Sequence, residues 1–280
     1  MRRRIKPIVV LVFFCLLFLL FFISISHANN QFQNQLKKAN ESIPSTITSK
    51  STSTTKKESK EFVLNPIIDV SGWQLPSEID YKTLSKNISG AIVRVYGGSQ
   101  IKSNNNAAYT TGVDKSFKTH IKQFQKYKVP VAVYSYALGK SVKDMKSEAK
   151  TFYDSASPYH PTFYWIDVEE KTMSNMNKGV QAFREELKRL GAKNVGIYIG
   201  TYFMTEQDIS VKDFDAIWIP TYGNDSGYYE AAPQTNLNYD LHQYTSQGYI
   251  PGFNNVLDLN QIAVTKDAKT TYEKLFGKSE

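Results

Sequence analysis

The feature that most constrains the fold is an alternation of short apolar runs with helical patterns, which begins near residue 62. Eight runs are typical of strands, at 66–70, 91–96, 129–137, 162–169, 195–200, 216–222, 241–245 and 257–262. Helical periodicity fills 113–127, 142–155 and 179–190, and the helical spacers shorten or vanish late in the chain. Eight strands with helices between them over roughly 200 residues predict an α/β fold, an irregular TIM-like β/α barrel with weak or missing helices after strand five.

An open doubly wound sheet is the alternative fold for the same order of elements. It is disfavoured because no glycine-rich phosphate-binding loop follows any of the predicted strands. The barrel domain is expected to span residues 62–280, and no internal repeat is visible in it.

The N-terminal segment, residues 1–28, has the pattern of a targeting sequence. Four of the first six residues are basic, a largely apolar run follows at 8–25, and small residues stand at the −3 and −1 positions of a possible cleavage site after Ala28. The segment is therefore predicted to be a secretory signal peptide or an uncleaved membrane anchor formed by residues 8–25. Either arrangement exports the remainder, which is then secreted or held at the cell surface.

Residues 29–61 and the distribution of charge limit the possible partners. This segment is rich in Ser, Thr, Asn and Lys and is predicted to be a disordered tether. The net charge of +8 arises in residues 1–60, which hold 10 Lys/Arg and 2 Asp/Glu, whereas residues 61–280 hold 24 of each. Because the predicted domain lacks a basic balance, no nucleic acid is expected as a partner. The single cysteine, Cys15, lies in the apolar run, which excludes a thiol enzyme.

Carboxylates at strand ends are the strongest chemical signal, since active sites of β/α barrels lie at the C-terminal ends of the strands. The fourth predicted strand ends with Asp167 and Glu169, which share one face with Trp165 because side chains alternate. Two neighbouring carboxylates raise each other's pKa, and a protonated carboxyl group is what the general acid of glycoside cleavage requires. Asp69 ends the first predicted strand and Asp258 lies in the last, so the four acids are expected at one mouth. The alternative is that the acids only cap the strand and meet basic side chains.

Other catalytic chemistries find little support. Beyond the N-terminal segment the histidines are His120, His160 and His242, and their spacing matches no zinc motif. No G-x-S-x-G nucleophile elbow is present. We therefore expect neither a metal nor a cofactor. His120 lies among lysines in a predicted helix and is expected at the surface.

Four segments, taken in order, resemble the motifs of glycoside hydrolase family 25, the N-acetylmuramidases or lysozymes of that family. Residues 69–74 (DVSGWQ) resemble its opening D-x-S-x-x-Q signature, and residues 165–169 (WIDVE) resemble its D-x-E strand. Residues 218–222 (WIPTY) are similar to its W-x-A-x-Y strand, and residues 243–260 are similar to its closing block. The resemblance covers about residues 64–263.

The resemblance implies a hydrolase that cleaves the β-1,4 bond between N-acetylmuramic acid and N-acetylglucosamine in the glycan strands of bacterial peptidoglycan. On this basis Glu169 is the expected general acid, and Asp167 is expected to orient or stabilise the N-acetyl group of the substrate. Asp69 and Asp258 are expected to be flanking acids. The alternatives are another barrel glycosidase, such as a chitinase or an endo-N-acetylglucosaminidase, or a non-catalytic protein that binds the cell wall.

The sequence departs from the family pattern on the second and third predicted strands. Where many members have K-A-S/T-E-G, residues 93–98 read VRVYGG, so the cation there is Arg94. Where many have Y-H-F, residues 134–136 read YSY, and Pro220 replaces a small residue. These changes affect the substrate subsites more than the core acids. Arg94 is expected to pair with an acid of the site or with a wall carboxylate.

The expected substrate-binding residues combine aromatic rings, which can stack on sugars, with polar groups. They are Tyr134, Tyr136, Trp165, Trp218, Tyr222, Gln243 and Arg94. The alternative is that the rings fill the barrel core. Tyr134 and Tyr136 share a face of their strand, so both or neither should point inward.

Overall fold

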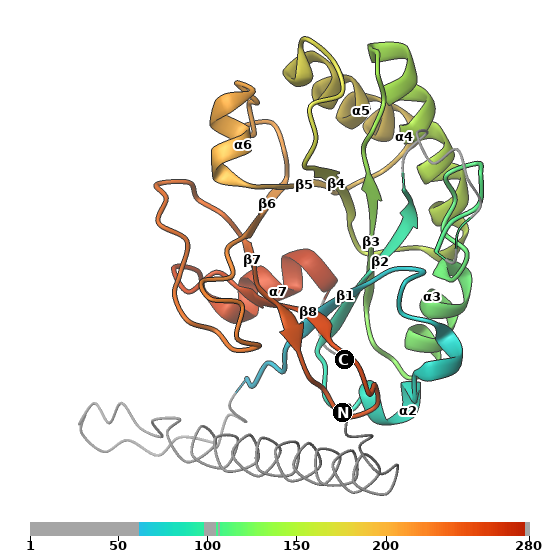
Figure 1. Ribbon diagram of the computed structural model, residues 1–280, viewed down its shortest axis with the longest axis vertical. Helices are drawn as coiled ribbons and strands as arrows, with labels where there is room; N and C mark the ends of the chain where they lie inside the picture. The colour runs from blue at the N-terminus through green and yellow to red at the C-terminus, as the bar shows by residue number, and fades with distance from the viewer. Residues whose placement is uncertain (1–61, 98–104, 106, 278–280) are drawn as a thin grey trace, which may run out of the picture. The chain divides into compact units, whose positions relative to one another are not determined.

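The computed structural model of the protein describes residues 62–97, 105 and 107–277. Its eight strands form a closed barrel in sequence order, with helices on the outside (Figure 1). The predicted irregular β/α barrel is confirmed. Both the 1–28 leader and the 29–61 tether lie outside the described residues and stay predictions. Within the described part of the chain, no helix is both long and apolar enough to cross a membrane.

Each predicted strand corresponds to one observed strand, with small differences at the ends. The strands are β1 (Ile67–Val70), β2 (Gly90–Tyr96), β3 (Val131–Tyr136), β4 (Tyr164–Val168), β5 (Val195–Ile199), β6 (Ala216–Pro220), β7 (Leu241–Gly248) and β8 (Leu257–Ile262). Neighbours from β1 to β7 pair in parallel. Their C-terminal ends therefore meet at one mouth of the barrel.

Helices are weak or missing after β5, as the sequence pattern indicates. They are α2 (Tyr81–Leu84), α3 (Phe117–Lys126), α4 (Val142–Ala156), α5 (Met176–Leu190), α6 (Thr201–Glu206) and α7 (Ala268–Phe276), with 3-10 turns η1 (Pro76–Glu78) and η2 (Ser157–Tyr159). No helix separates β6 from β7 among the described residues. The ends of α5 follow local rules: Asn175 caps its first turn, and Gly191 ends it with a φ of 113°.

Strand alternation sorts the side chains into two apolar layers. Ile166 and Val168 of β4 face outward and belong to the same core cluster as Phe152 of α4 and Phe183 of α5. Trp165 faces inward and belongs to the cluster inside the barrel. Residues 166 and 168 therefore pack under the helices.

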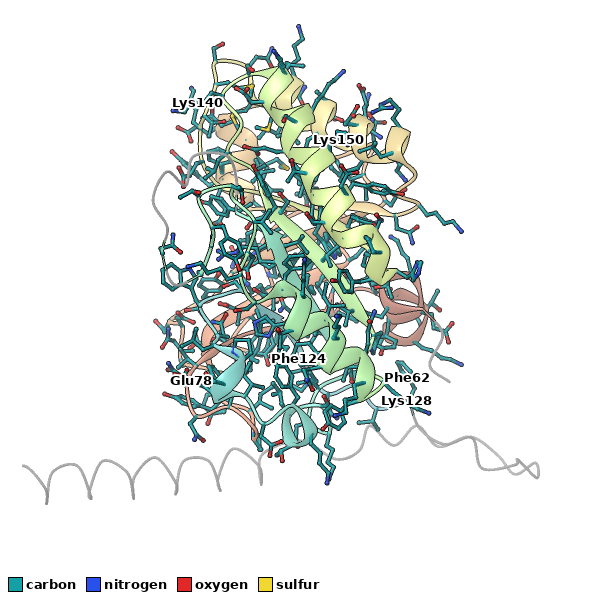
Figure 2. The ribbon with its side chains drawn as sticks, turned by 90° about the vertical axis from the view of Figure 1, so that its right-hand side faces the viewer. Phe62, Glu78, Phe124, Lys128, Lys140 and Lys150 are labelled. Atoms are coloured by element: carbon teal, nitrogen blue, oxygen red, sulfur yellow. The ribbon has the colours of Figure 1, made fainter. Side chains whose placement is uncertain are left out.

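The outer surface of α3 and α4 carries exposed charged side chains, and Figure 2 shows it face on. Lys128 and Lys150 extend from this surface, whereas Phe124 on the opposite side of α3 is fully buried. The contrast explains why the helical periodicity could be read from the sequence: one stripe of each helix packs on the barrel and the other stays in water.

The last strand, β8, runs antiparallel to both β7 and β1. The sequence interpretation assumed nothing about its direction. Because β8 is reversed, its first residues lie at the mouth where the other strands have their last. Asp258, the second residue of β8, therefore lies directly opposite Asp69 of β1.

His120 is buried, so its expected place at the surface is wrong. The helical period puts it on the buried side of α3 with Phe124. Its Nε2 lies 3.1 Å from the carbonyl oxygen of Ser71, and its Nδ1 lies 2.7 Å from the hydroxyl of Tyr81. A carbonyl can only accept, so Nε2 carries the proton and Nδ1 accepts from Tyr81. Burial lowers the pKa of His120, which favours this neutral form.

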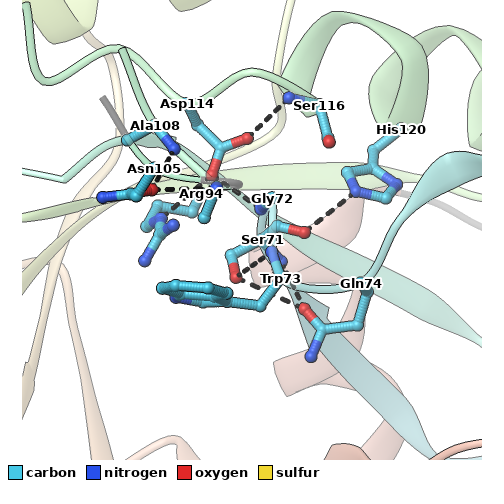
Figure 3. A network of polar contacts seen from close by, with 11 residues as sticks. Ser71, Gly72, Trp73, Gln74, Arg94, Asn105, Ala108, Asp114, Ser116 and His120 are labelled. Carbon is cyan, nitrogen blue, oxygen red and sulfur yellow. Dashed lines mark hydrogen bonds and ion pairs between the residues drawn. The ribbon is translucent and has the colours of Figure 1, made fainter. Parts of the chain in front are cut away.

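A buried carboxylate, Asp114, holds the loop that follows β1 (Figure 3). Its Oδ2 accepts from the Gly72 amide at 2.7 Å and from Arg94 Nε at 3.0 Å, and its Oδ1 accepts from the Ser116 amide at 2.8 Å. The backbone at Gly72 lies so close to that of Ala107 that a Cβ at position 72 would be 2.2 Å from the carbonyl oxygen of Ala107. Only glycine therefore fits at position 72.

Candidate active site

One pocket of about 270 Å³ opens at the mouth of the barrel, where the predicted site residues converge. Its lining comprises Asp69, Ser71, Trp73, Gln74, Arg94, Tyr134, Tyr136, Asp167, Glu169, Tyr198, Trp218, Tyr222, Gln243 and Asp258. Every residue expected at the site from the sequence is among them, apart from Trp165. Ser71, Trp73, Gln74 and Tyr198 are additions that the sequence interpretation did not select.

The sheet register explains why residues distant in sequence meet here. On β3, β4 and β5, Tyr136 is paired with Asp167, and Asp167 is paired with Tyr198, so the three side chains occupy one level of the barrel. On the other side of the mouth Asp69 and Asp258 are paired. The level of each side chain along the barrel axis is thus fixed by backbone hydrogen bonds.

Trp165 lies in the barrel core and not in the pocket. Its ring stacks on Phe163 with centroids 4.8 Å apart and meets Trp218 edge to face at 5.6 Å. It has the inward orientation that strand alternation predicts, but it lies one layer below Asp167. The expectation that Trp165 contacts substrate is therefore corrected: its ring fills the core beneath the pocket floor.

Tyr134 and Tyr136 both face the pocket, consistent with their shared face of β3. The hydroxyl of Tyr136 donates to Glu170 at 2.7 Å, at the outer edge of the site. Trp73 projects from the β1 loop at the rim and is 60% exposed. An exposed indole beside an acidic pocket offers a flat apolar surface of the kind on which sugar rings stack.

Asp69 is held by a chain of hydrogen bonds that joins several strands. Gln243 Nε2 donates to Asp69 Oδ2 at 2.8 Å. The amide oxygen of Gln243 accepts from the hydroxyls of Tyr198 at 2.7 Å and Tyr222 at 2.5 Å. Two hydroxyl donors at that oxygen leave the amide nitrogen facing Asp69, so the orientation of Gln243 is determined.

Asn260 of β8 supplies a second donor to the same oxygen of Asp69, also at 2.8 Å. Its own amide oxygen accepts from the indole Nε1 of Trp218 at 2.8 Å. Burial raises the pKa of Asp69 to about 6, although the two amide donors act in the opposite direction. Asp69 is therefore mostly ionised at neutral pH, and its orientation is fixed.

Asp167 and Glu169 form a coupled pair of carboxyl groups. Burial raises the pKa of Asp167 well above its ordinary value, and the charges of Glu169 and Asp69 add to this effect. Enclosure by the protein also raises the pKa of Glu169, although hydrogen bonding to Asp167 opposes the rise. Both pKa values are thus raised, and the two groups titrate as a coupled pair.

The two members of the pair differ in access to solvent. Asp167 is buried, and its Oδ1 has no hydrogen-bonding partner among the described residues. The side chain of Glu169 is reached by solvent although protein atoms surround much of it. Glu169 can therefore touch an incoming molecule and water, whereas Asp167 presents an unused acceptor at the base of the pocket.

Arg94 forms its ion pair with Asp114 and with none of the four pocket acids. The sequence interpretation expected Arg94 to pair with an acid of the site or with a wall carboxylate, and within the protein its partner is Asp114 instead of an acid of the site. Asp114 is 20 positions further along the chain, in the segment between β2 and α3. No local pattern in the sequence indicates this pairing.

Paired carboxyl groups with raised pKa values, set among aromatic rings at a barrel mouth, are the arrangement of a glycoside hydrolase. The chain belongs to the glycosyl hydrolases family 25, whose family model matches residues 68–253. The resemblance read from the motifs is thereby confirmed, and the chain is an enzyme of the lysozyme type.

Solved structures of several relatives share this architecture. A glycosyl hydrolase 25 of Streptococcus pneumoniae, described as a virulence factor participating in host cell invasion, is 55% identical, with a TM-score of 0.75; the match covers 77% of this chain and 94% of that one. The catalytic domain of an endolysin from a Listeria monocytogenes bacteriophage is 26% identical, with a TM-score of 0.65 and coverage of 78% and 99%. A lysozyme from Streptomyces coelicolor, 15% identical with a TM-score of 0.58 and coverage of 78% and 99%, shares the fold. No curated protein matches the chain in sequence.

Proposed function

We propose that the enzyme is an N-acetylmuramidase, which hydrolyses the β-1,4 bond between N-acetylmuramic acid and N-acetylglucosamine in peptidoglycan. The observation that carries the proposal is the Asp167–Glu169 pair, whose pKa values are both raised, at the mouth of a family 25 barrel. The similarity to a phage endolysin and to a pneumococcal glycosyl hydrolase 25 supports it.

Glu169 is the proposed general acid because it is the member of the pair that solvent reaches. It donates its proton to the bridging oxygen as the bond from that oxygen to C1 of muramic acid breaks. The bond electrons stay on the oxygen, which leaves as the 4-hydroxyl group of N-acetylglucosamine. Water then adds its oxygen to C1, and its proton returns to Glu169.

Asp167 is the proposed partner of the N-acetyl group of muramic acid. Its buried Oδ1 lacks a hydrogen-bonding partner among the described residues, and a buried acceptor of this kind requires a donor. The amide N–H of the N-acetyl group is such a donor. Asp69 is held by Gln243 and Asn260 on the opposite wall of the pocket, where its negative charge stabilises the positive charge that develops at C1.

The test is digestion of purified peptidoglycan by the full-length protein, followed by borohydride reduction and identification of the reduced sugar. A muramidase yields new muramic acid reducing ends, recovered as muramitol. If glucosaminitol is recovered instead, the protein is still a glycoside hydrolase, but it is an endo-N-acetylglucosaminidase. If the folded protein releases no fragments, the alternative of a non-catalytic protein that binds the cell wall would be favoured.

The pH profile should depend on Asp258, whose pKa burial raises to about 8, with repulsion from Asp69 adding to the effect. The charge of Glu169 is a further cause of that rise, so the two carboxyl groups interact. An amide at position 258 does not titrate. Asp258→Asn should therefore change the alkaline limb of kcat/KM near pH 8, measured between about pH 4 and pH 10. Glu185→Gln, an exposed change on α5, should leave the limb in place; an unmoved limb in Asp258→Asn would contradict the coupling.

A further inference from the structure

The pocket contains one cationic side chain among its lining residues, Arg94, against four carboxyl groups. Arg94 lies on β2, and its side chain is only 13% exposed. An anionic substituent of a substrate would be repelled by the acids on every other charged wall of the pocket. The position of Arg94 is therefore the place where this pocket can accept negative charge.

Arg94 is fixed in position by Asp114, which is saturated by other donors. Asp114 also accepts from the backbone amides of Gly72 and Ser116, so neither of its oxygens is free to move with the guanidinium group. Figure 3 shows the terminal nitrogens of Arg94 directed away from Asp114. The side chain is thus pre-oriented, and binding to it costs little side-chain entropy.

Within the described residues, the remaining donors of Arg94 are unused. Its printed contact with Asp114 engages Nε, and no described residue accepts a hydrogen bond from Nη1 or Nη2. A largely buried guanidinium group with unused donors in a pocket matches the planar fork of a carboxylate. Arg94 also acts electrostatically on Tyr134 and Asp167, so a carboxylate bound there would lie beside the reacting sugar.

We propose that Arg94 determines substrate specificity by binding a carboxylate carried by the 3-O substituent of muramic acid. The inference rests on the proposed muramidase function. N-acetylmuramic acid differs from N-acetylglucosamine by a lactyl ether at O3, which ends in a carboxyl group. The anion is the lactyl carboxylate itself in a peptide-free chain, or a carboxylate of the stem peptide where the lactyl group is amidated. A chitin-type chain has neither and would leave the terminal donors of Arg94 without a carboxylate.

The test uses full-length protein and compares enzyme variants at Arg94 with substrate variants at the carboxylate, as in a double-mutant cycle. Alternating N-acetylglucosamine–N-acetylmuramic acid chains are prepared without peptides and with stem peptides, and each is used with free carboxylates and with all carboxyl groups converted to methylamides. The enzymes are the wild type, Arg94→Gln and the double variant Arg94→Gln/Asp114→Asn. The double variant removes both charges of the buried pair, in case a lone Asp114 prevents folding. Arg189→Gln, an exposed arginine on α5, is the matched control.

We expect methylamidation to lower kcat/KM of the wild type and of Arg189→Gln by about 10- to 100-fold, as expected for a lost hydrogen bond to a charged group. In both Arg94 variants the ratio between charged and neutral chains should fall close to one. Dependence in the peptide-free chains assigns the lactyl carboxylate, and dependence only in the stem-bearing chains assigns the peptide.

An equal effect of methylamidation on the wild type and the Arg94 variants, in both kinds of chain, would overturn the inference. If the wild type still generated muramic acid ends in that case, the proposed function would stand without this specificity determinant. If the wild type cleaved none of the chains, the proposed function and the inference would fail together, and the two results are thus distinguishable.

Discussion

Glu169→Gln should lower the rate of peptidoglycan hydrolysis by about 10²- to 10⁴-fold, the range for loss of a general acid. Glutamine has the same shape but cannot donate a proton to the leaving oxygen. The side chain is reached by solvent at the pocket mouth, so the fold should be unaffected. The measurement is the initial rate of release of new reducing ends, with circular dichroism to verify folding.

Glu170→Gln is the matched control for this prediction, because Glu170 is the adjacent acid and is exposed. Its carboxylate accepts a hydrogen bond from the hydroxyl of Tyr136. We expect a change of no more than a few-fold, since the neutral amide still accepts from that hydroxyl. Full activity of Glu169→Gln, or an equal loss in Glu170→Gln, would remove Glu169 from the role of general acid.

Asp167→Asn should lower activity by about 10²-fold or more and at the same time stabilise the protein by about 0.5–2 kcal/mol. The loss arises because the amide cannot hold the charge that the N-acetyl group requires. The stabilisation arises because the buried carboxyl group is forced beside Glu169 and Asp69 in the native state. A residue that merely supported the fold would show the opposite change in stability.

The pH dependence of that stabilisation has a definite sign. The pKa of Asp167 is raised in the folded protein above its unfolded value of about 3.9. The folded state therefore binds the proton more tightly, and this contribution to wild-type stability is fully present below about pH 4 and is lost as pH rises through the folded pKa. The gain in Tm from Asp167→Asn should grow from acid to alkaline pH, whereas Asp213→Asn, an exposed change, should show no such trend. A gain that shrinks with pH would contradict the raised pKa.

The barrel could be predicted because its determinants are local and periodic. Inward and outward residues alternate on every strand, and the buried stripe of each long helix repeats at the helical period. The direction of β8 was the feature of the barrel that was not predicted. The short connection between β7 and β8 was a usable signal, because strands joined by a tight turn pair antiparallel while parallel strands need a long crossover.

Within the site, alternation identified the face of each residue but not its depth. Trp165 and Asp167 share a face of β4, yet one lies in the core and the other in the pocket, because depth is set by register with β3 and β5. Tyr198 was missed for the same reason: its inward position on the fifth strand was readable, and its alignment with Asp167 was not. Trp73 stood in a motif already identified, but a loop residue has no periodicity to show where it points.

Contacts between distant segments could not be predicted from the sequence. The Arg94–Asp114 ion pair depends on how the segment after β2 returns to the β1 loop, and nothing in either segment alone indicates it. His120 was misplaced because neighbouring lysines outweighed its position in the helical repeat. A single polar residue on a buried stripe becomes interpretable only when its partners, Ser71 and Tyr81, are known.

The hydrogen bonds that hold Asp69 have a consequence for when the enzyme becomes able to act. Asp69 lies near the start of the described chain, whereas its two amide donors, Gln243 and Asn260, arrive 174 and 191 residues later. A nascent or truncated chain that ends before β7 has the Asp167–Glu169 pair but neither an oriented Asp69 nor a closed mouth. We therefore expect a chain that lacks β7 and β8 to be inactive, although it contains both members of the Asp167–Glu169 pair.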